Sequence, residues 1–256
     1  MMNSRNMKTR ERGFSAIEML ISVALITLVL GVAFAGMRDM QARNFAEGSR
    51  VDTLQETRDF IDQVVRDVHV SGYPSSRVLG QAVGTIGSCT GNVAIACGII
   101  QFSPLQVTYE GDLDGTQVIR QIYLNLVPGP GGACPCTLQR GVVPKTIPAT
   151  AVTYFTEANG VLNSGNGASA STYGVALGGS GNYTTYTTAD VFTAYQSNGT
   201  QFAGTCGIPT ADAWGCRNIR SLQITANVAP SFMDPATKLF PVFSITSKAR
   251  LNNNSF

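Results

Sequence analysis

The pattern of hydrophobic and polar positions predicts one long helix at the start of the chain. Phe14 to Met37 is predominantly apolar and its only charged residue is Glu18, so the segment is long enough to cross a bilayer as a helix. From Arg38 to Val70 there is no proline, and apolar residues recur at three- and four-residue steps, which predicts an amphipathic continuation. The helix should end at Ser71-Gly72-Tyr73-Pro74, because glycine can cap it and proline cannot continue it.

After this helix the pattern changes to short segments rich in β-branched and aromatic residues, separated by Gly, Pro, Asn or Asp. Several of these segments alternate with period two. The predicted strands are 99–102, 105–109, 117–124, 151–155, 221–228 and 242–246. This arrangement favours an antiparallel sheet with one face on the helix, and therefore an α+β fold.

A short basic leader precedes the apolar segment. It carries Arg5, Lys8, Arg10 and Arg12 against the single acid Glu11, which predicts that this end stays cytoplasmic and that the rest of the chain is exported. The sequence after the apolar segment contains no evident small-residue cleavage site, and the segment is longer than the apolar region of an ordinary secretory signal.

Gly13-Phe14 followed by Glu18 resembles the processing motif of the type IV pilin superfamily. The resemblance implies that a prepilin peptidase cuts between Gly13 and Phe14 and methylates the new amino terminus of Phe14. It also implies a lollipop layout: a leader at 1–13, a long helix at 14–72 with its transmembrane segment at 14–37, and a β-rich head at 73–256.

Two further segments, 51–60 and 66–73, look closest to the minor pilins called PilW, which are related to the J-type pseudopilins of type II secretion. Residues 247–253 are similar to the closing strand of that group. The resemblance implies a minor pilin that inserts into or primes a type IV pilus through its helix. The alternatives are a type II secretion pseudopilin and a binding pilin or adhesin whose activity lies in the head.

The implied partners are the prepilin peptidase, other major and minor pilins, the assembly platform of the inner membrane, and membrane lipid before assembly. Before assembly the chain would be a single-pass inner-membrane protein with its head in the periplasm. After assembly it would lie in a pilus or pseudopilus fibre.

Glu18 is an acid inside a membrane helix and needs a partner there, because an unpaired carboxylate in lipid costs several kcal/mol. The pilin resemblance implies that it pairs with the amino terminus of Phe14 on a neighbouring subunit. The alternative is that Glu18 sits at headgroup depth, where the positive end of the helix dipole favours an anion.

The formal charge of +2 is dominated by the leader. Without its four basic residues and one acid, 14 basic and 15 acidic residues remain of the 18 and 16 in the whole chain. This balance predicts no nucleic-acid partner. His69 is the only histidine and no catalytic constellation surrounds it, so we expect neither an enzyme nor a cofactor.

All six cysteines follow the membrane segment: Cys89, Cys97, Cys134, Cys136, Cys206 and Cys216. An even number in an exported head predicts disulfides. Proximity suggests Cys89 with Cys97 and Cys206 with Cys216. Because a bridge across one residue would be strained, Cys134 and Cys136 are expected to bond elsewhere, which would change the other two pairings. Zinc and redox roles are weaker alternatives.

Glu110, Asp112 and Asp114 alternate before Gly115, as at the start of a calcium loop, but the closing acid is absent because Gln121 occupies that place. A solvated hairpin turn is the favoured interpretation and calcium the weaker one. A second unusual segment, at about 159–201, is rich in Gly, Ser, Thr and Tyr. It predicts loops or edge strands, with a contact surface formed by Tyr173, Tyr183, Tyr186 and Tyr195 as the alternative.

Overall fold

The computed structural model describes residues 15–75, 91–129, 134–163, 183–184, 189–207 and 216–252. The chain divides into two compact units, residues 1–45 and 46–256. Gly13, Phe14 and Cys89 lie outside the described residues, as does most of the predicted insertion at 159–201.

One helix, α1 (Ala16–Val70), contains 55 residues and belongs to both units. The predicted long helix is therefore confirmed. It ends where the sequence indicates, since the amides of Ser71 and Tyr73 donate to the carbonyls of Val68 and Val70. Gly72 follows with a φ of 77°, a left-handed conformation that glycine adopts without steric cost.

Among the described residues, the second unit contains one antiparallel sheet of eight strands. In chain order these are β1 (Ile99–Phe102), β2 (Gln106–Gly111), β3 (Arg120–Val127), β4 (Cys136–Pro144), β5 (Tyr154–Val161), β6 (Phe192–Gln196), β7 (Ile219–Val228) and β8 (Phe243–Arg250). The strands run in the order β1-β2-β3-β4-β5-β7-β6, and β8 pairs with β7 on its other side. Together with α1 this sheet confirms the α+β class.

The sheet consists of two halves. The strands β1 to β5 form one antiparallel meander, and β6, β7 and β8 form the other half. The halves are joined through a single pair, Val161 of β5 opposite Val228 of β7. Gly160 lies beside this junction with a φ of 69°, and a Cβ on it would stand 2.2 Å from the carbonyl oxygen of Ala229. Only glycine fits this crossing without a shift of the backbone.

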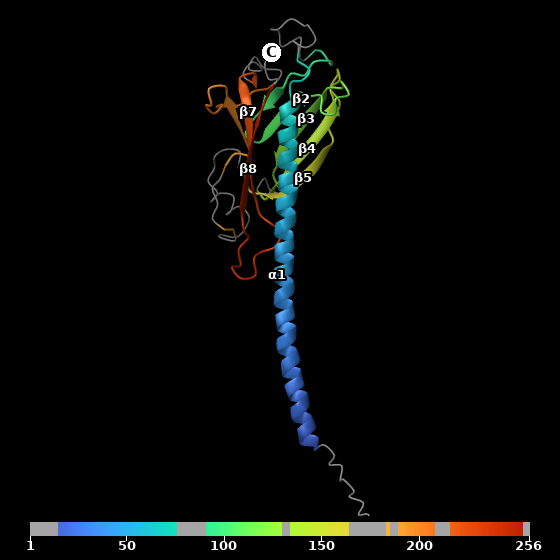
Figure 1. Cartoon of the computed structure of the whole chain (residues 1–256), viewed down its shortest axis with the longest axis vertical. Helices are drawn as coiled ribbons and strands as arrows, with labels where there is room; N and C mark the ends of the chain where they lie inside the picture. Colours follow the sequence, from blue (N-terminus) through green and yellow to red (C-terminus); the bar gives the residue numbers. More distant parts are fainter. Residues whose placement is uncertain are drawn as a thin grey trace, which may run out of the picture. The chain divides into compact units, whose positions relative to one another are not determined.

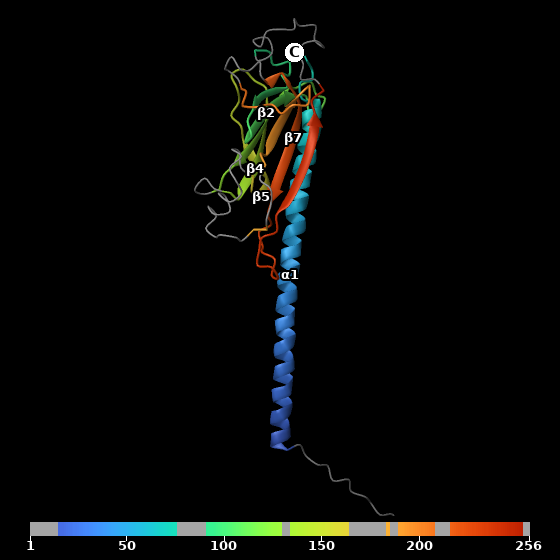
Figure 2. The same ribbon diagram turned by 90° about the vertical axis from the view of Figure 1, so that its left-hand side faces the viewer.

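Within the second unit, the end of α1 packs against the sheet. Figure 1 shows this part of the helix with β7 and β8 on one side and β4 and β5 on the other. In Figure 2, turned by 90°, β4, β5 and β7 all lie to one side of the helix. Its buried side chains recur at three- and four-residue steps, as an amphipathic helix requires. They are Thr57, Phe60, Ile61, Val64, Asp67 and Val68.

The strands supply the other half of this core by alternation. On β3 the side chains of Ile122, Leu124 and Leu126 are buried, whereas the residues between them are only half-buried. This period of two places one face of β3 on the helix side. Phe60, Ile61, Val64 and Val68 of α1 belong to the same buried cluster as these three residues.

Candidate functional site

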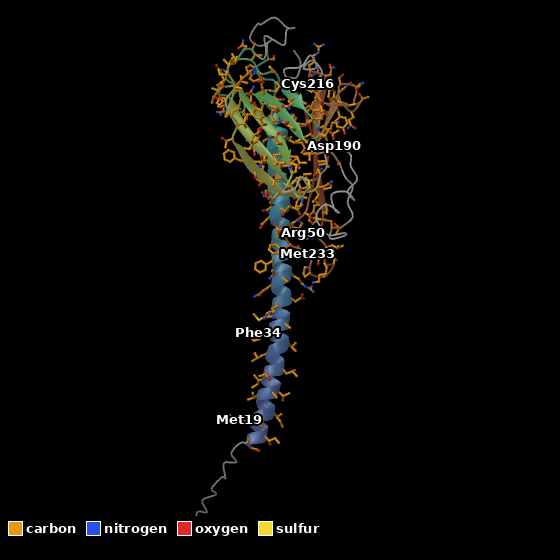
Figure 3. All side chains as sticks on the ribbon, turned by 180° about the vertical axis from the view of Figure 1, so that it is seen from behind. Met19, Phe34, Arg50, Asp190, Cys216 and Met233 are labelled. Atoms are coloured by element: carbon orange, nitrogen blue, oxygen red, sulfur yellow. A yellow bond between two sulfur atoms is a disulfide. The ribbon has the colours of Figure 1, made fainter. Side chains whose placement is uncertain are left out.

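The first unit presents an apolar helical surface. Every large apolar side chain between Ile17 and Met40 is between 48% and 70% exposed. Figure 3 shows Met19 and Phe34 projecting from α1 in this unit. Among the described residues, α1 is the one helix that is long and apolar enough to cross a membrane by length and composition. An apolar surface of this extent marks a site of contact with lipid or with other proteins.

Glu18 is the single charged residue of this surface between Ile17 and Met37. It lies in the first turn of α1 and is exposed, and the hydroxyl of Ser22 donates to its backbone carbonyl at 2.8 Å. None of the residues described in the structure forms an ion pair with its carboxylate. In an apolar environment, a counter-charge for Glu18 must therefore come from a group outside these residues. The positive end of the helix dipole also favours an anion at this position.

A polar cluster fixes the end of α1 to the sheet in the second unit. Nη2 of Arg140, on β4, donates to Oδ2 of Asp67, on α1, at 2.7 Å. The hydroxyl of Tyr109, on β2, lies 3.4 Å from the same oxygen. Burial raises the pKa of the Asp67 carboxyl, and the charge and hydrogen bond of Arg140 oppose that rise. Burial, with the charge of Asp67 beside it, raises the pKa of Tyr109 well above its usual range.

A second buried cluster lies between the sheet and the segment before β1. Nζ of Lys145 is 2.7 Å from Oε2 of Glu110, and each side chain is only 2% exposed. Lys145 also donates to the carbonyl of Ile95 at 2.8 Å. The carboxylate of Glu110 accepts from the amide of Cys97 at 2.9 Å and from the side chain of Gln121 at 2.8 Å. These hydrogen bonds satisfy both charges inside the protein.

The three acids proposed as calcium ligands have different hydrogen-bond partners in the structure. Glu110 lies buried in β2 and binds Lys145, so it is not part of a solvated turn. Asp112 accepts from the amide of Gln117 at 3.0 Å. Asp114 accepts from the side chains of Thr116 at 2.6 Å and of Arg120 at 3.0 Å, and the pKa of its carboxyl is lowered to about 2, chiefly by the Thr116 hydrogen bonds.

The predicted hairpin is confirmed, because β2 and β3 pair antiparallel from Gln106 opposite Asn125 to Gly111 opposite Arg120. Within the part of the chain that the structure describes, no group of three or more His, Cys, Asp or Glu side chains is placed to hold a metal ion.

One disulfide prediction is confirmed and one is wrong. Cys206 pairs with Cys216, as their proximity suggests. Cys134 pairs with Cys136 instead of bonding elsewhere. The chain turns sharply before β4 and brings their Cα atoms to 4.3 Å, whereas a regular strand would hold two such residues much farther apart. Cys97 is also disulfide-bonded, and its predicted partner Cys89 lies outside the described residues.

The structure describes two of the four tyrosines proposed as a contact surface. Tyr183 packs against Phe240 with ring centroids 5.4 Å apart. Tyr195, on β6, lies beneath the ammonium group of Lys248 at 3.8 Å. Both are half-buried. Tyr173 and Tyr186 lie outside the described residues. His69 is exposed near the end of α1.

Sequence reasoning missed the two basic residues that complete the buried clusters, Arg140 and Lys145. Neither belongs to a motif, and their acidic partners lie 73 and 35 positions away. One signal was present: Lys145 is the last basic residue before a segment without Lys or Arg that extends to Cys216.

Comparisons of the chain with family models, with curated proteins and with solved structures find no match.

Proposed function

We propose that the chain is a minor pilin of the type IV superfamily, of the PilW kind, with a structural and assembly role and no enzymatic one. In this proposal the helix inserts into a filament, or primes one, and the head is carried on the filament. The peptidase removes residues 1–13 and methylates Phe14. The chain waits in the inner membrane, with its head in the periplasm, before it joins the other pilins at the assembly platform.

The observation that carries the proposal is the combination of an exposed apolar segment of α1 with one acid near its start. Lipid alone satisfies the apolar side chains, but it does not supply a counter-charge for Glu18. A neighbouring copy of the same kind of helix supplies both, because it offers apolar packing and a new amino terminus at Phe14. Cleavage after Gly13 is what creates that charge.

The first experiment tests processing. The full chain is expressed in a bacterial membrane with and without a prepilin peptidase, and its intact mass is measured. We expect loss of residues 1–13 and addition of one methyl group only when the peptidase is present, and no cleavage in the Gly13→Leu variant. An uncut chain in the presence of an active peptidase would refute the proposal.

The second experiment tests assembly. Glu18→Gln preserves the shape of the side chain and removes its charge, so the variant should still be inserted and cleaved. Its incorporation into sheared pili should fall at least about tenfold, because the amino terminus of its neighbour loses its counter-charge. Glu47→Gln is the matched control, since Glu47 is an exposed acid on the same helix. Equal incorporation of both variants would exclude the pairing role of Glu18.

A further inference from the structure

The face of β6, β7 and β8 that points away from the core is polar and cationic. The sheet register places Tyr195, Ser221 and Arg250 side by side across the three strands. In the next outward row, Lys248 lies opposite Gln223. Arg250 and Lys248 are two positions apart on β8 and are both exposed. Two cations therefore share one face of this half of the sheet.

The row between Ser221 and Gln223 shows which face of the sheet points toward the core. Ala194, Leu222 and Ala249 lie opposite one another and are fully buried. Their neighbours along each strand must then point outward, because successive side chains alternate across a sheet. The polar face is a consequence of the same alternation that builds the core.

This face carries an open cavity of about 630 Å³. It is lined by three cations, Arg220, Lys248 and Arg250, and by the uncharged polar residues Gln196, Ser197 and Ser221. No carboxylate is among the described residues that line it. Its volume lies within the usual range for small-ligand sites of about 300–1,000 Å³, and every side chain that lines it carries a polar or charged group.

Several lining groups are held in place by their neighbours. The ammonium group of Lys248 lies 3.8 Å from the ring centroid of Tyr195. The hydroxyl of Tyr195 donates to Oε1 of Gln223 at 3.2 Å, which fixes the ring. Arg220 donates through Nη1 to the carbonyl of Arg217 at 2.7 Å. Cations restrained in this way lose less conformational freedom when a ligand binds.

The lining selects the chemistry of the ligand. Guanidinium and ammonium groups bind oxyanions, and the adjacent hydroxyl and amide groups bind ligand hydroxyls. The ammonium group of Lys248 covers one face of the Tyr195 ring, so that face is closed to stacking. Single-stranded nucleic acids depend on such stacking, and duplex binding requires a longer series of phosphate contacts than three cations supply.

We propose that this cavity binds an acidic saccharide, that is, a sugar ring bearing a carboxylate. Arg250 and Lys248 hold the carboxylate, and Ser221, Ser197 and Gln196 bind the ring hydroxyls. The head then carries a recognition function in addition to the assembly function of the helix. This proposal does not depend on the filament assignment, because it uses residues of the second unit alone.

The test uses the full chain in non-ionic detergent micelles and ligand-observed NMR titrations. The probes are glucuronic acid, glucose as its uncharged counterpart, and inorganic phosphate as a bare oxyanion. We expect glucuronic acid to bind more tightly than either control, and its binding to weaken with added salt. Arg250→Gln and Lys248→Gln should each weaken binding about tenfold, the loss of one charge-assisted hydrogen bond.

Lys238→Gln is the matched control, because Lys238 is an exposed cation that does not line the cavity. It should leave binding unchanged. The thermal unfolding of each variant is compared with that of the wild type, and exposed sites of this kind should preserve it. Three outcomes would overturn the proposal. The first is no binding of glucuronic acid, and the second is binding of phosphate as tight as that of glucuronic acid, which would indicate an adventitious ion only. The third is an equal effect of Arg250→Gln, Lys248→Gln and Lys238→Gln.

Discussion

Asp67 on α1 and Arg140 on β4 are separated by 73 positions in the chain and are joined by a hydrogen bond of 2.7 Å. Their side chains are only 12% and 13% exposed. The contact fixes the rotation of the helix end against the sheet, because an ion pair that is largely buried has few alternative geometries. It is a directional link between α1 and β4, in addition to the apolar packing of the helix end on the sheet.

Removing one partner of this pair should be costly. Arg140→Met keeps the apolar stem but leaves Asp67 buried without its cation, so the free energy of unfolding should fall by about 3 kcal/mol. Arg120→Met is the control, because the Arg120–Asp114 pair is 33% and 42% exposed and should contribute less than about 1 kcal/mol. Urea unfolding of the full chain in micelles measures both changes. Similar losses in the two variants would contradict the structural role of Arg140.

The pair formed by Lys145 and Glu110 allows a double-mutant test. Lys145→Met strands a carboxylate that is almost fully buried and should lower the free energy of unfolding by about 3–5 kcal/mol. Adding Glu110→Gln removes the stranded charge and should recover most of that loss. The measurement is again urea unfolding, with each single variant as a reference. If the two losses simply add, the residues do not act as a pair.

Two glycines with positive φ provide a matched comparison. Gly160 has a φ of 69° and a Cβ there would meet the carbonyl oxygen of Ala229, whereas Gly115 has a φ of 70° and open space around it. Gly115→Ala should cost only the conformational penalty, about 1 kcal/mol. Gly160→Ala should cost at least about 2 kcal/mol more, because backbone must move. Thermal unfolding measures the difference, and equal costs would show that the junction adapts easily.

Asp114 should give stability a dependence on acid pH. Its pKa is lowered from 3.8 to about 2 in the folded protein, so the contribution of its charge is complete above the unfolded value. That contribution is lost as the pH falls through the folded value. The difference in unfolding free energy between the wild type and Asp114→Asn should therefore shrink between pH 4 and pH 2, and a flat difference would contradict this.

The sequence predicted the elements whose patterns are strong and local. The uninterrupted apolar segment from Phe14 and the amphipathic pattern that ends at Val70 predicted the two ends of the helix almost to the residue. The strand at 99–102 was also predicted with the bounds that β1 has. The expected strands at 117–124 and 151–155 begin three residues before β3 and β5, since loop residues next to a strand share its composition.

Two strands escaped prediction because their signals are weak. β4 contains Gly141, a poor strand former, next to the charged Arg140, and each residue has a tertiary contact that explains its place. Arg140 binds the helix, and a Cβ on Gly141 would stand 2.3 Å from the side chain of Val152. β6 is a segment of five residues within the Gly/Ser/Thr/Tyr-rich region. Of the proposed sites, Glu18 and the apolar helix could be predicted from the sequence. The cationic cavity could not, because it depends on a strand register that no local pattern encodes.

The single pair between Val161 and Val228 has a consequence for local opening. Beside it, the amide of Leu162 donates to Asn227 and that of Ala229 donates to Gly160. Few backbone hydrogen bonds must break for the two halves to part there, in contrast to the eight pairs that join β7 to β8. In deuterated water these two amides should exchange their protons well before the amides inside β7, so the junction is the first line along which the head loosens.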